Sequence, residues 1–190
     1  SDCNAGKIDA IRTKIQEWNN KSLITGDEFY VLLASLIEAV PFVANISGNY
    51  AAYLKHWDPR ALKTIMLQVP NIPGSIRRNK AYKSDANELI KNISCDILYL
   101  DPPYNGRQYA PNYHILETVA KWDNPNISGI TGMRPYDKQK SVFCQKNIAA
   151  NAFNEIIENA QTKFILLSYN DEGLMSEQEI IGILSQRGRV

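Results

Sequence analysis

The chain has 190 residues, 44% of them hydrophobic and 22% charged, and its formal net charge is +1. This is the composition of a globular protein that is long enough to bury a core, and the length predicts one domain, or one domain with a smaller second one. Because the charge is nearly balanced, a strong overall attraction to nucleic acid is excluded, and any DNA contact must come from a local basic patch.

The sequence carries no mark of a membrane or secreted protein. No apolar run reaches the ~18 residues of a membrane-spanning helix. The N-terminus lacks a signal-peptide pattern. The three cysteines, Cys3, Cys95 and Cys144, are far apart and show neither a pairing pattern nor metal-ligand spacing. We therefore expect reduced thiols, no metal site and a cytoplasmic protein.

The first part of the chain, residues 1–75, is expected to be helical. Apolar residues recur at helical spacing in a first stretch, at Ile8, Ile11, Ile15 and Trp18. A second helix would begin at a cap provided by Thr25 or Asp27. Its predicted buried face consists of Phe29, Leu32, Leu33, Leu36, Ile37 and Val40.

Prolines divide this helical part further. Pro41 should bend or interrupt the second helix. Asp58 precedes another proline and is expected to open a short helix that runs through Leu67. We expect the two tryptophans of this part, Trp18 and Trp57, to be core residues.

The second part, residues 76–190, alternates strands and helices. Strands are predicted at residues 81–84, 97–100 and 164–169, and helices at residues 88–91, 113–121, 146–160 and 176–187. Ser176, followed three residues later by Glu179, forms a capping-box pattern for the last of these helices. The compact apolar runs at 97–100 and 164–169 are typical of strands buried in a parallel sheet. The alternation therefore predicts an α/β fold with a parallel sheet.

The most informative residues follow the strand at 97–100: Asp101, Pro102, Pro103 and Tyr104. Ligands of open α/β sheets bind beyond the carboxyl ends of the strands, which is where Asp101 is expected. Two successive prolines stiffen the turn and remove two N–H donors, so the turn presents carbonyl acceptors. Tyr104 adds a flat aromatic ring beside those acceptors.

This group suits the methylation of an exocyclic amine on a nucleobase. The nitrogen lone pair of such an amine is delocalised into the ring. Hydrogen bonds accepted by the Asp101 carboxylate and the Pro102 carbonyl would shift the nitrogen toward a tetrahedral, nucleophilic geometry. Positioning should then supply much of the rate, and the Tyr104 ring would hold a base that has left the helix.

At these four residues the chain resembles the DNA adenine-N6 methyltransferases of bacterial restriction-modification systems, which carry a DPPY catalytic motif. The resemblance continues beyond the motif. Residues 105–109 and 112–118 look like the segment that follows DPPY in these enzymes, and residues 167–170 are similar to the later strand that lines the target-base pocket. Apart from its strand context, DPPY is a short pattern that also occurs by chance.

The resemblance implies a fold, a cofactor and partners. The fold would be a partial Rossmann-like methyltransferase sheet in residues 76–190, with a helical target-recognition region in residues 1–75. The cofactor would be S-adenosylmethionine, contacted by Asp85, Ala86 and Asp101. The partners would be double-stranded DNA and a cognate restriction endonuclease that acts on the same site, in the bacterial cytoplasm.

One part of the family pattern is missing. These enzymes hold the methionine part of the cofactor on a glycine-rich loop of Phe-x-Gly-x-Gly type, which would lie near the N-terminus. The stretch at residues 4–7 is not such a loop, because no strand precedes it. We therefore expect the chain to be a fragment that lacks this first cofactor motif.

Several residues have a second, plain interpretation. The predicted DNA contacts are Arg77, Arg78, Lys80, Arg107 and Tyr109. A basic run such as 77–83 is usually a solvated face, although its place after a breaker-rich loop and before the predicted sheet favours phosphate contact, and Arg107 is equally a partner for an acidic neighbour. Asp85 is as compatible with capping the next helix as with binding cofactor. For Tyr109 and Tyr113 packing is favoured, and for His114 a structural role is favoured over a general base.

Two other functions stay open from the sequence. The same motif serves the N4 amine of cytosine or an amine in RNA, which would keep the site and change the substrate. Because the glycine-rich loop is missing, the chain by itself is also compatible with a non-catalytic DNA-binding module.

Overall fold

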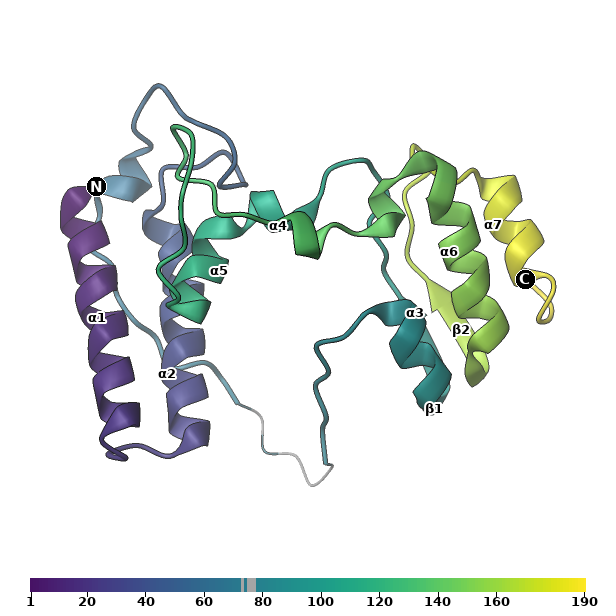
Figure 1. Cartoon of the computed structure of the whole chain (residues 1–190), viewed down its shortest axis with the longest axis horizontal. Helices are drawn as coiled ribbons and strands as arrows, with labels where there is room; N and C mark the ends of the chain where they lie inside the picture. The colour runs from purple at the N-terminus through teal and green to yellow at the C-terminus, as the bar shows by residue number, and fades with distance from the viewer. Residues whose placement is uncertain (73, 75–77) are drawn as a thin grey trace. The chain divides into compact units, whose positions relative to one another are not determined.

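The computed structural model describes residues 1–72, 74 and 78–190, and the chain divides into two compact units (Figure 1). The first unit comprises Ser1–Ile76 and Tyr109–Asp137, and the second comprises Arg77–Gln108 and Lys138–Val190. The chain therefore passes between the units three times. Arg77, one of the predicted DNA contacts, lies outside the described residues.

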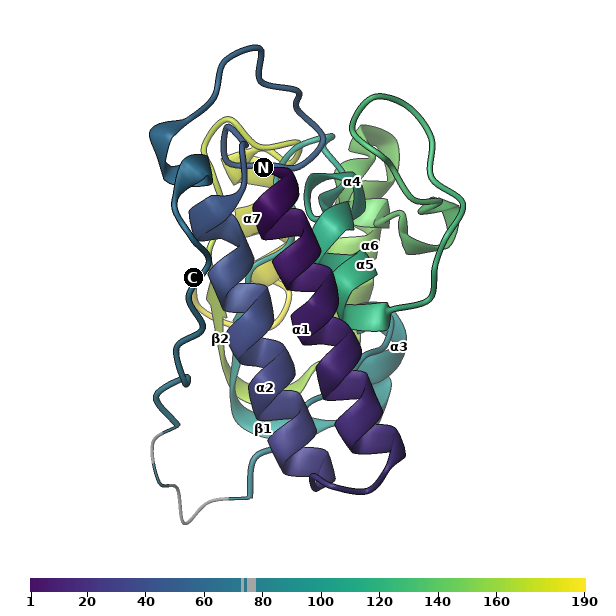
Figure 2. The same cartoon turned by 90° about the vertical axis from the view of Figure 1, so that its left-hand side faces the viewer.

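Two long helices, α1 (Asp2–Asn20) and α2 (Gly26–Ala39), run antiparallel and side by side in the first unit (Figure 1, Figure 2). Thr25 caps α2, as predicted. Its hydroxyl accepts a hydrogen bond from the backbone N–H of Glu28, and the Glu28 carboxylate accepts one from the backbone N–H of Thr25. The two helices predicted for this part are thus confirmed.

Shorter elements complete this unit. Pro41 lies in the 3-10 turn Val40–Val43 directly after α2, which confirms the predicted interruption. A second 3-10 turn, Pro59–Leu62, begins at the predicted cap Asp58. The remaining helices of the unit are α4 (Tyr109–Asn112) and α5 (His114–Lys121), and α5 matches the helix predicted at 113–121.

The predicted helix from Asp58 through Leu67 is wrong, because it ends at Leu62. Asn4 on α1 gives the physical reason. Its buried side-chain amide donates hydrogen bonds to the carbonyls of Ala61 (3.2 Å) and Lys63 (2.7 Å) and accepts one from the N–H of Ile65 (3.1 Å). These backbone groups are paired with a side chain and not with one another, so the segment runs extended along α1.

The core of the first unit lies between α1, α2 and α5. Its buried members are Ile15, Leu36, Ala39, Val43, Ile65 and Val119. Trp18 and Trp57 are not part of it: they are 38% and 57% exposed, so their prediction as core residues is wrong. Helical spacing fixes the side of α1 on which Trp18 lies, but not where the packed surface ends.

Arg12 is a buried charge that joins α1 to α5. Its Nε atom donates to the carbonyl of Val119 (2.8 Å) and an Nη atom donates to that of Ala120 (3.3 Å). The guanidinium also lies over the rings of Phe29 and Trp122, 5.6 and 5.3 Å from their centroids. Carbonyls at the end of a helix lack helical partners and attract positive charge. Burial lowers the pKa of Arg12 below its ordinary value.

His114 is the first residue of α5 and is fully buried. Its Nε2 atom lies 3.2 Å from the carbonyl oxygen of Tyr50. A neutral imidazole that carries its proton on Nε2 can donate a hydrogen bond to this oxygen. Burial lowers the pKa of His114 below its ordinary value and raises the pKa of Tyr50 to about 12. The burial of His114 agrees with the structural role favoured for it, although its buried Nδ1 atom has no hydrogen-bond partner.

The second unit contains a parallel pair of strands, β1 (Ser94–Leu100) and β2 (Gln161–Leu167). The register pairs Leu98 with Ile165 and Leu100 with Leu167. Both strands confirm the predictions at 97–100 and 164–169, although β2 ends at Leu167. The helices of this unit are α3 (Ala86–Leu89), α6 (Lys146–Asn159) and α7 (Glu177–Leu184), with 3-10 turns at Ile90–Asn92, Asp137–Gln139 and Val142–Cys144.

The helices of the second unit agree with prediction, and one strand does not. Helix α6 matches 146–160, and α7 begins at the predicted cap Ser176, whose capping box with Glu179 is formed. The strand predicted at residues 81–84 is wrong. These residues are exposed and pair with no strand in the described part of the chain. A strand requires a neighbour, which short-range sequence does not specify.

One face of the sheet is packed and the other is not. Leu98, Leu100, Ile165 and Leu167 pack against the buried face of α6, which consists of Ala149, Ala152, Phe153, Ile156 and Ile157. The alternate residues are 57–66% exposed: Ile97, Tyr99, Phe164 and Leu166. The prediction of strands buried on both faces therefore holds for one face only. A small parallel sheet with helices is nevertheless compatible with the predicted α/β class.

No helix in the described part of the chain is long and apolar enough to cross a membrane. Cys3 and Cys95 are exposed, Cys144 is buried, and all three are free thiols. Among the described residues, no group of three or more histidine, cysteine or carboxylate side chains forms a metal site.

Replacing Arg12 with alanine should destabilise the first unit by about 2–4 kcal/mol, because the buried carbonyl of Val119 and the half-buried carbonyl of Ala120 lose their donor and a cavity replaces the guanidinium. Urea unfolding followed by tryptophan fluorescence would measure this. Lys14→Ala on the same helix is the control, since Lys14 forms only an exposed ion pair with Glu17. Equal midpoints for the two variants would contradict the role assigned to Arg12.

The free energy of unfolding should decrease as the pH falls from 7.5 to 5.5. Because the pKa of His114 is lowered in the folded protein, the unfolded chain takes up a proton below the ordinary value of about 6.5 that the folded protein does not. Urea midpoints at several pH values would show this slope. His114→Gln should flatten it, whereas a variant of the exposed histidine, His56→Gln, should keep it.

Candidate active site

The predicted catalytic residues begin where β1 ends. The backbone N–H of Ser168 donates a hydrogen bond to the carbonyl of Leu100 (2.9 Å), so the pairing of the two strands continues to the residue before Asp101. Asp101 and Ser168 therefore lie at the same edge of the sheet. This edge, at the carboxyl ends of parallel strands, is the usual ligand-binding edge of an α/β sheet.

A hollow of about 290 Å³ opens at this edge, and we call it the β1 hollow. Asp101, Pro102 and Pro103 form part of its lining, as predicted for a site. The rest consists of Ala86, Tyr99, Leu100, Ser141, Phe143, Phe153 and Ile156. Apolar walls with a few converging polar groups are typical of small-molecule sites. The turn thus borders a cavity, while Asp101 itself is exposed.

Tyr104 stands beside the β1 hollow and not in its lining, and it is 39% exposed. Its carbonyl accepts a hydrogen bond from the backbone N–H of Leu174 (2.8 Å). The segment that supplies this donor is itself folded back, because the Tyr169 hydroxyl accepts from the N–H of Met175 (3.2 Å). Gly173 lies so close to Tyr169 that an added Cβ would overlap the tyrosine ring. The loop after β2 therefore fixes the backbone of Tyr104, while the aromatic ring stays accessible.

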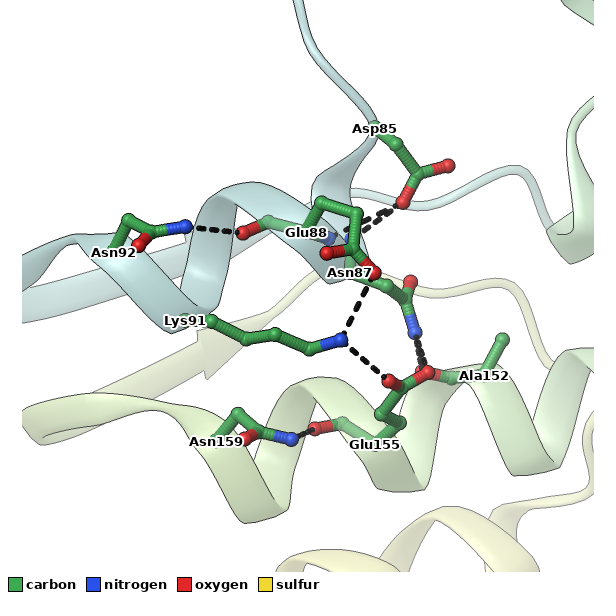
Figure 3. A network of polar contacts seen from close by, with 8 residues as sticks. All are labelled: Asp85, Asn87, Glu88, Lys91, Asn92, Ala152, Glu155 and Asn159. Carbon is green, nitrogen blue, oxygen red and sulfur yellow. Dashed lines mark hydrogen bonds and ion pairs between the residues drawn. The ribbon is translucent and has the colours of Figure 1, made fainter.

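Asp85 caps helix α3, which confirms one of its two interpretations. Its Oδ1 atom accepts hydrogen bonds from the backbone N–H groups of Asn87 (2.9 Å) and Glu88 (3.3 Å). Figure 3 shows the other carboxylate oxygen turned away from the helix. Ala86, the next residue, lines the β1 hollow together with Asp101. Two of the three predicted cofactor contacts thus border one cavity, and Asp85 adjoins it in the chain.

A network of polar contacts fastens α3 to α6 (Figure 3). The buried Asn87 amide donates to the carbonyl of Ala152 (3.0 Å) and to the Glu155 carboxylate (2.7 Å). Lys91 forms ion pairs with Glu88 (2.9 Å) and Glu155 (3.1 Å). The hydrogen bond from Asn87 and then the contact with Lys91 lower the pKa of Glu155. Since Phe153 and Ile156 are also on α6, the network holds one wall of the β1 hollow against another.

The predicted DNA contacts are not gathered at the β1 hollow. Arg78, Lys80 and Arg107 belong to the second unit and are exposed. Among the described residues, Arg107 forms no ion pair, but its backbone N–H donates to the side-chain oxygen of Asn105 (2.9 Å). Tyr109 belongs to the first unit and stacks on Tyr113, with ring centroids 6.2 Å apart. This contact agrees with the packing role favoured for both tyrosines.

Besides Tyr99 and Leu100, which were predicted only as part of a strand, four lining residues of the β1 hollow were not predicted as site residues: Ser141, Phe143, Phe153 and Ile156. For two of them a signal exists. Phe153 and Ile156 lie three residues apart on the apolar face of a predicted helix, which must pack on the sheet that ends at Asp101. Ser141 and Phe143 lie in a segment without periodicity, and only a long-range contact brings them to the site.

Comparisons with known proteins bear on the family of this chain. The model of the family described as D12 class N6 adenine-specific DNA methyltransferase matches residues 1–183. The chain is 55% identical over 185 residues to the Type II methyltransferase M.FokI of Planomicrobium okeanokoites. The matched region covers 97% of this chain and 29% of that protein. No solved structure matches.

Two further relatives are similar. The modification methylase StsI of Streptococcus sanguinis is 46% identical over 183 residues, covering 96% of this chain and 28% of that protein. The Type II methyltransferase M.NlaIII of Neisseria lactamica is 44% identical over 189 residues, covering all of this chain and 56% of that protein. The chain thus spans between about a quarter and just over half of the length of these relatives. The resemblance first seen at Asp101–Pro102–Pro103–Tyr104 is confirmed, and the chain belongs to the D12 class of N6 adenine-specific DNA methyltransferases.

Proposed function

We propose that the protein to which this chain belongs transfers a methyl group from S-adenosylmethionine to N6 of adenine in a specific sequence of double-stranded DNA. The observation that carries the proposal is the position of Asp101, Pro102 and Pro103, which line a hollow at the carboxyl end of β1. Membership of an N6 adenine-specific family supports the choice of adenine.

Asp101 and Pro102 act on the amino group of the target base. The carboxylate of Asp101 and the carbonyl of Pro102 accept the two N–H groups and orient the nitrogen lone pair toward the methyl donor. The lone pair forms the new N–C bond as the S–C bond of the donor breaks, and the methylated nitrogen then loses a proton. No strong base is needed beforehand, so orientation supplies much of the rate.

Tyr104 stacks on the target base in this proposal. A base inside the duplex cannot reach a hollow at a sheet edge, so it must turn out of the helix, and an aromatic face then replaces the stacking that it loses. The accessible ring and the fixed backbone of Tyr104 suit this role.

The β1 hollow also suits part of the methyl donor. Its volume of about 290 Å³ is near the lower limit of about 300–1,000 Å³ for ligand pockets. The rings of Phe143 and Phe153 and the side chain of Ile156 offer apolar walls for a heterocycle. The carboxylates of Asp85 and Asp101 offer acceptors for hydroxyl and amino groups. S-adenosylmethionine supplies an electrophilic methyl on a sulfonium, and Asp85, Ala86 and Asp101 would hold it.

DNA contacts and partners complete the proposal. Arg78, Lys80 and Arg107 are exposed cations that could bind phosphates, and Arg77 and Tyr109 remain predicted contacts on sequence grounds. We assign target recognition to the helical region 1–75. The names of the relatives as Type II and modification methylases support a cognate endonuclease that cuts the same DNA sequence.

We also propose that the sheet is part of a larger Rossmann-like one. Parallel strands joined through a connection that contains a helix, as β1 and β2 are through α6, are the repeating unit of that fold. The exposed apolar face at Ile97, Tyr99, Phe164 and Leu166 supports this proposal. Parallel sheets are normally covered on both faces.

Asp101→Ala in the intact protein should lower the rate of DNA methylation by at least about 10²-fold, because a group that stabilises developing charge is lost. DNA affinity in a gel-shift assay should persist. Mass spectrometry of the digested DNA would identify N6-methyladenine as the product. Asp96→Ala is the matched control, since Asp96 lies on the same strand, is exposed, and pairs with Lys163.

Full activity in the Asp101→Ala variant would refute its catalytic role. N4-methylcytosine as the sole product would refute the choice of base, and DNA binding without binding of S-adenosylmethionine would favour a non-catalytic module.

Replacements of Asp85 separate its cap from its proposed contact with cofactor. Asn is also a good helix cap, so Asp85→Asn should keep stability and weaken the binding of S-adenosylmethionine, as measured by calorimetry. Asp85→Ala should weaken binding and also cost about 1 kcal/mol of stability. If Asp85→Asn binds S-adenosylmethionine as tightly as wild type, Asp85 serves only as the cap of α3.

A further inference from the structure

The side chain of Gln108 pairs with the backbone of Ser141, 33 residues away. Its amide nitrogen donates to the carbonyl of Ser141 (3.0 Å), and its amide oxygen accepts from the N–H of Ser141 (2.6 Å). One side chain thereby satisfies both backbone groups of a residue, as an adjacent strand would. Gln108 lies in the stretch after the DPPY motif, and the proposed function gives Gln108 itself no task.

The pairing lies where the chain leaves and re-enters the second unit. The last residue before the excursion to the first unit is Gln108, and the chain returns at Lys138. The two hydrogen bonds of Gln108 thus join the chain just before residues 109–137 to the chain just after them.

A second set of contacts follows the same path. The Cys144 thiol donates to the carbonyl of Arg107 (3.4 Å), and a Cβ added at Gly106 would lie 3.7 Å from the carbonyl oxygen of Cys144. The Ser141 hydroxyl accepts from the N–H of Phe143 (3.2 Å), which begins the turn Val142–Cys144. Residues 106–108 and 141–144 are therefore fastened along their length.

This fastening determines one wall of the β1 hollow. Ser141 and Phe143 line it, and Asp101, Pro102 and Pro103 line it as well. Gln108 is four residues beyond Tyr104 and is not itself a lining residue. Its two hydrogen bonds thus connect the segment that carries the DPPY motif to the wall formed by Ser141 and Phe143.

We propose that Gln108 is a positioning residue, which holds the wall formed by Ser141 and Phe143 at the distance from Asp101 that S-adenosylmethionine requires. It acts through Ser141 and touches neither substrate nor cofactor. The inference rests on the proposed function of the β1 hollow. In it, Gln108 sets the distance between the two walls of that hollow.

Three variants of the intact protein test this role. Gln108→Ala removes both hydrogen bonds. Gln108→Glu keeps the shape and the acceptor but places a carboxylate against the carbonyl of Ser141, and it regains a donor only when the carboxyl is protonated. Gln145→Ala is the control, because Gln145 is exposed in the same segment and its side chain does not cap α6.

Gln108→Ala should raise KM for S-adenosylmethionine about tenfold, the order expected for two lost hydrogen bonds, with kcat changed less than threefold. At pH 8, Gln108→Glu should show the same rise in KM as Gln108→Ala. Its affinity for S-adenosylmethionine, measured by calorimetry relative to wild type at each pH, should recover as the pH falls to 5.5. Gln145→Ala should equal wild type throughout.

The inference is overturned if Gln108→Glu binds S-adenosylmethionine like wild type at pH 8, or if its relative affinity shows no recovery at low pH. Should Gln108→Ala fail to fold, the pH dependence of Gln108→Glu still decides. A wild-type protein that neither binds S-adenosylmethionine nor methylates DNA would refute the proposed function itself. Methylation by wild type with unaltered KM in both variants would refute only the role of Gln108.

Discussion

The parallel pairing of β1 with β2 is the constraint on which the second unit depends. Leu98, Leu100, Ile165 and Leu167 can be buried against α6 only when the strands are in this register, since a shift by one residue would turn them to the opposite face. The same register aligns the carboxyl ends of the strands. Asp101 therefore has a defined place because apolar side chains several residues earlier in the strand are packed.

In each of the two units, side-chain amides and guanidinium groups satisfy backbone groups of distant segments. Asn4 pairs with residues 61–65, Asn87 with Ala152, Gln108 with Ser141, and Arg12 with the end of α5. A buried carbonyl or N–H without a partner is costly, so each irregular segment needs such a donor or acceptor. These contacts fix loops that have no sheet to join. The contacts of Asn87 and Gln108 also join the separate segments that form the walls of the β1 hollow.

Local signals predicted much of the fold, and they pointed to four residues that line the β1 hollow, Ala86, Asp101, Pro102 and Pro103. The capping boxes at Thr25 and Ser176, the apolar runs of the two strands, and the prolines after Asp101 each act over a few residues, so the sequence displays them directly. The errors concern contacts between distant residues. The strand expected at 81–84 has no neighbour in the described part of the chain, Trp18 and Trp57 lie outside the packed surface, and the wall at Ser141 depends on Gln108.

The exposed apolar face of the sheet has a consequence for how these 190 residues behave by themselves. Ile97, Tyr99, Phe164 and Leu166 form a flat patch of the kind that drives colloidal association, and the outer edges of a two-stranded sheet leave backbone groups open to pairing with other chains. A concentrated solution of this polypeptide alone should thus be prone to oligomerise and precipitate through β-rich contacts. Keeping it in solution would require a low protein concentration or a binding partner that covers the exposed face of the sheet.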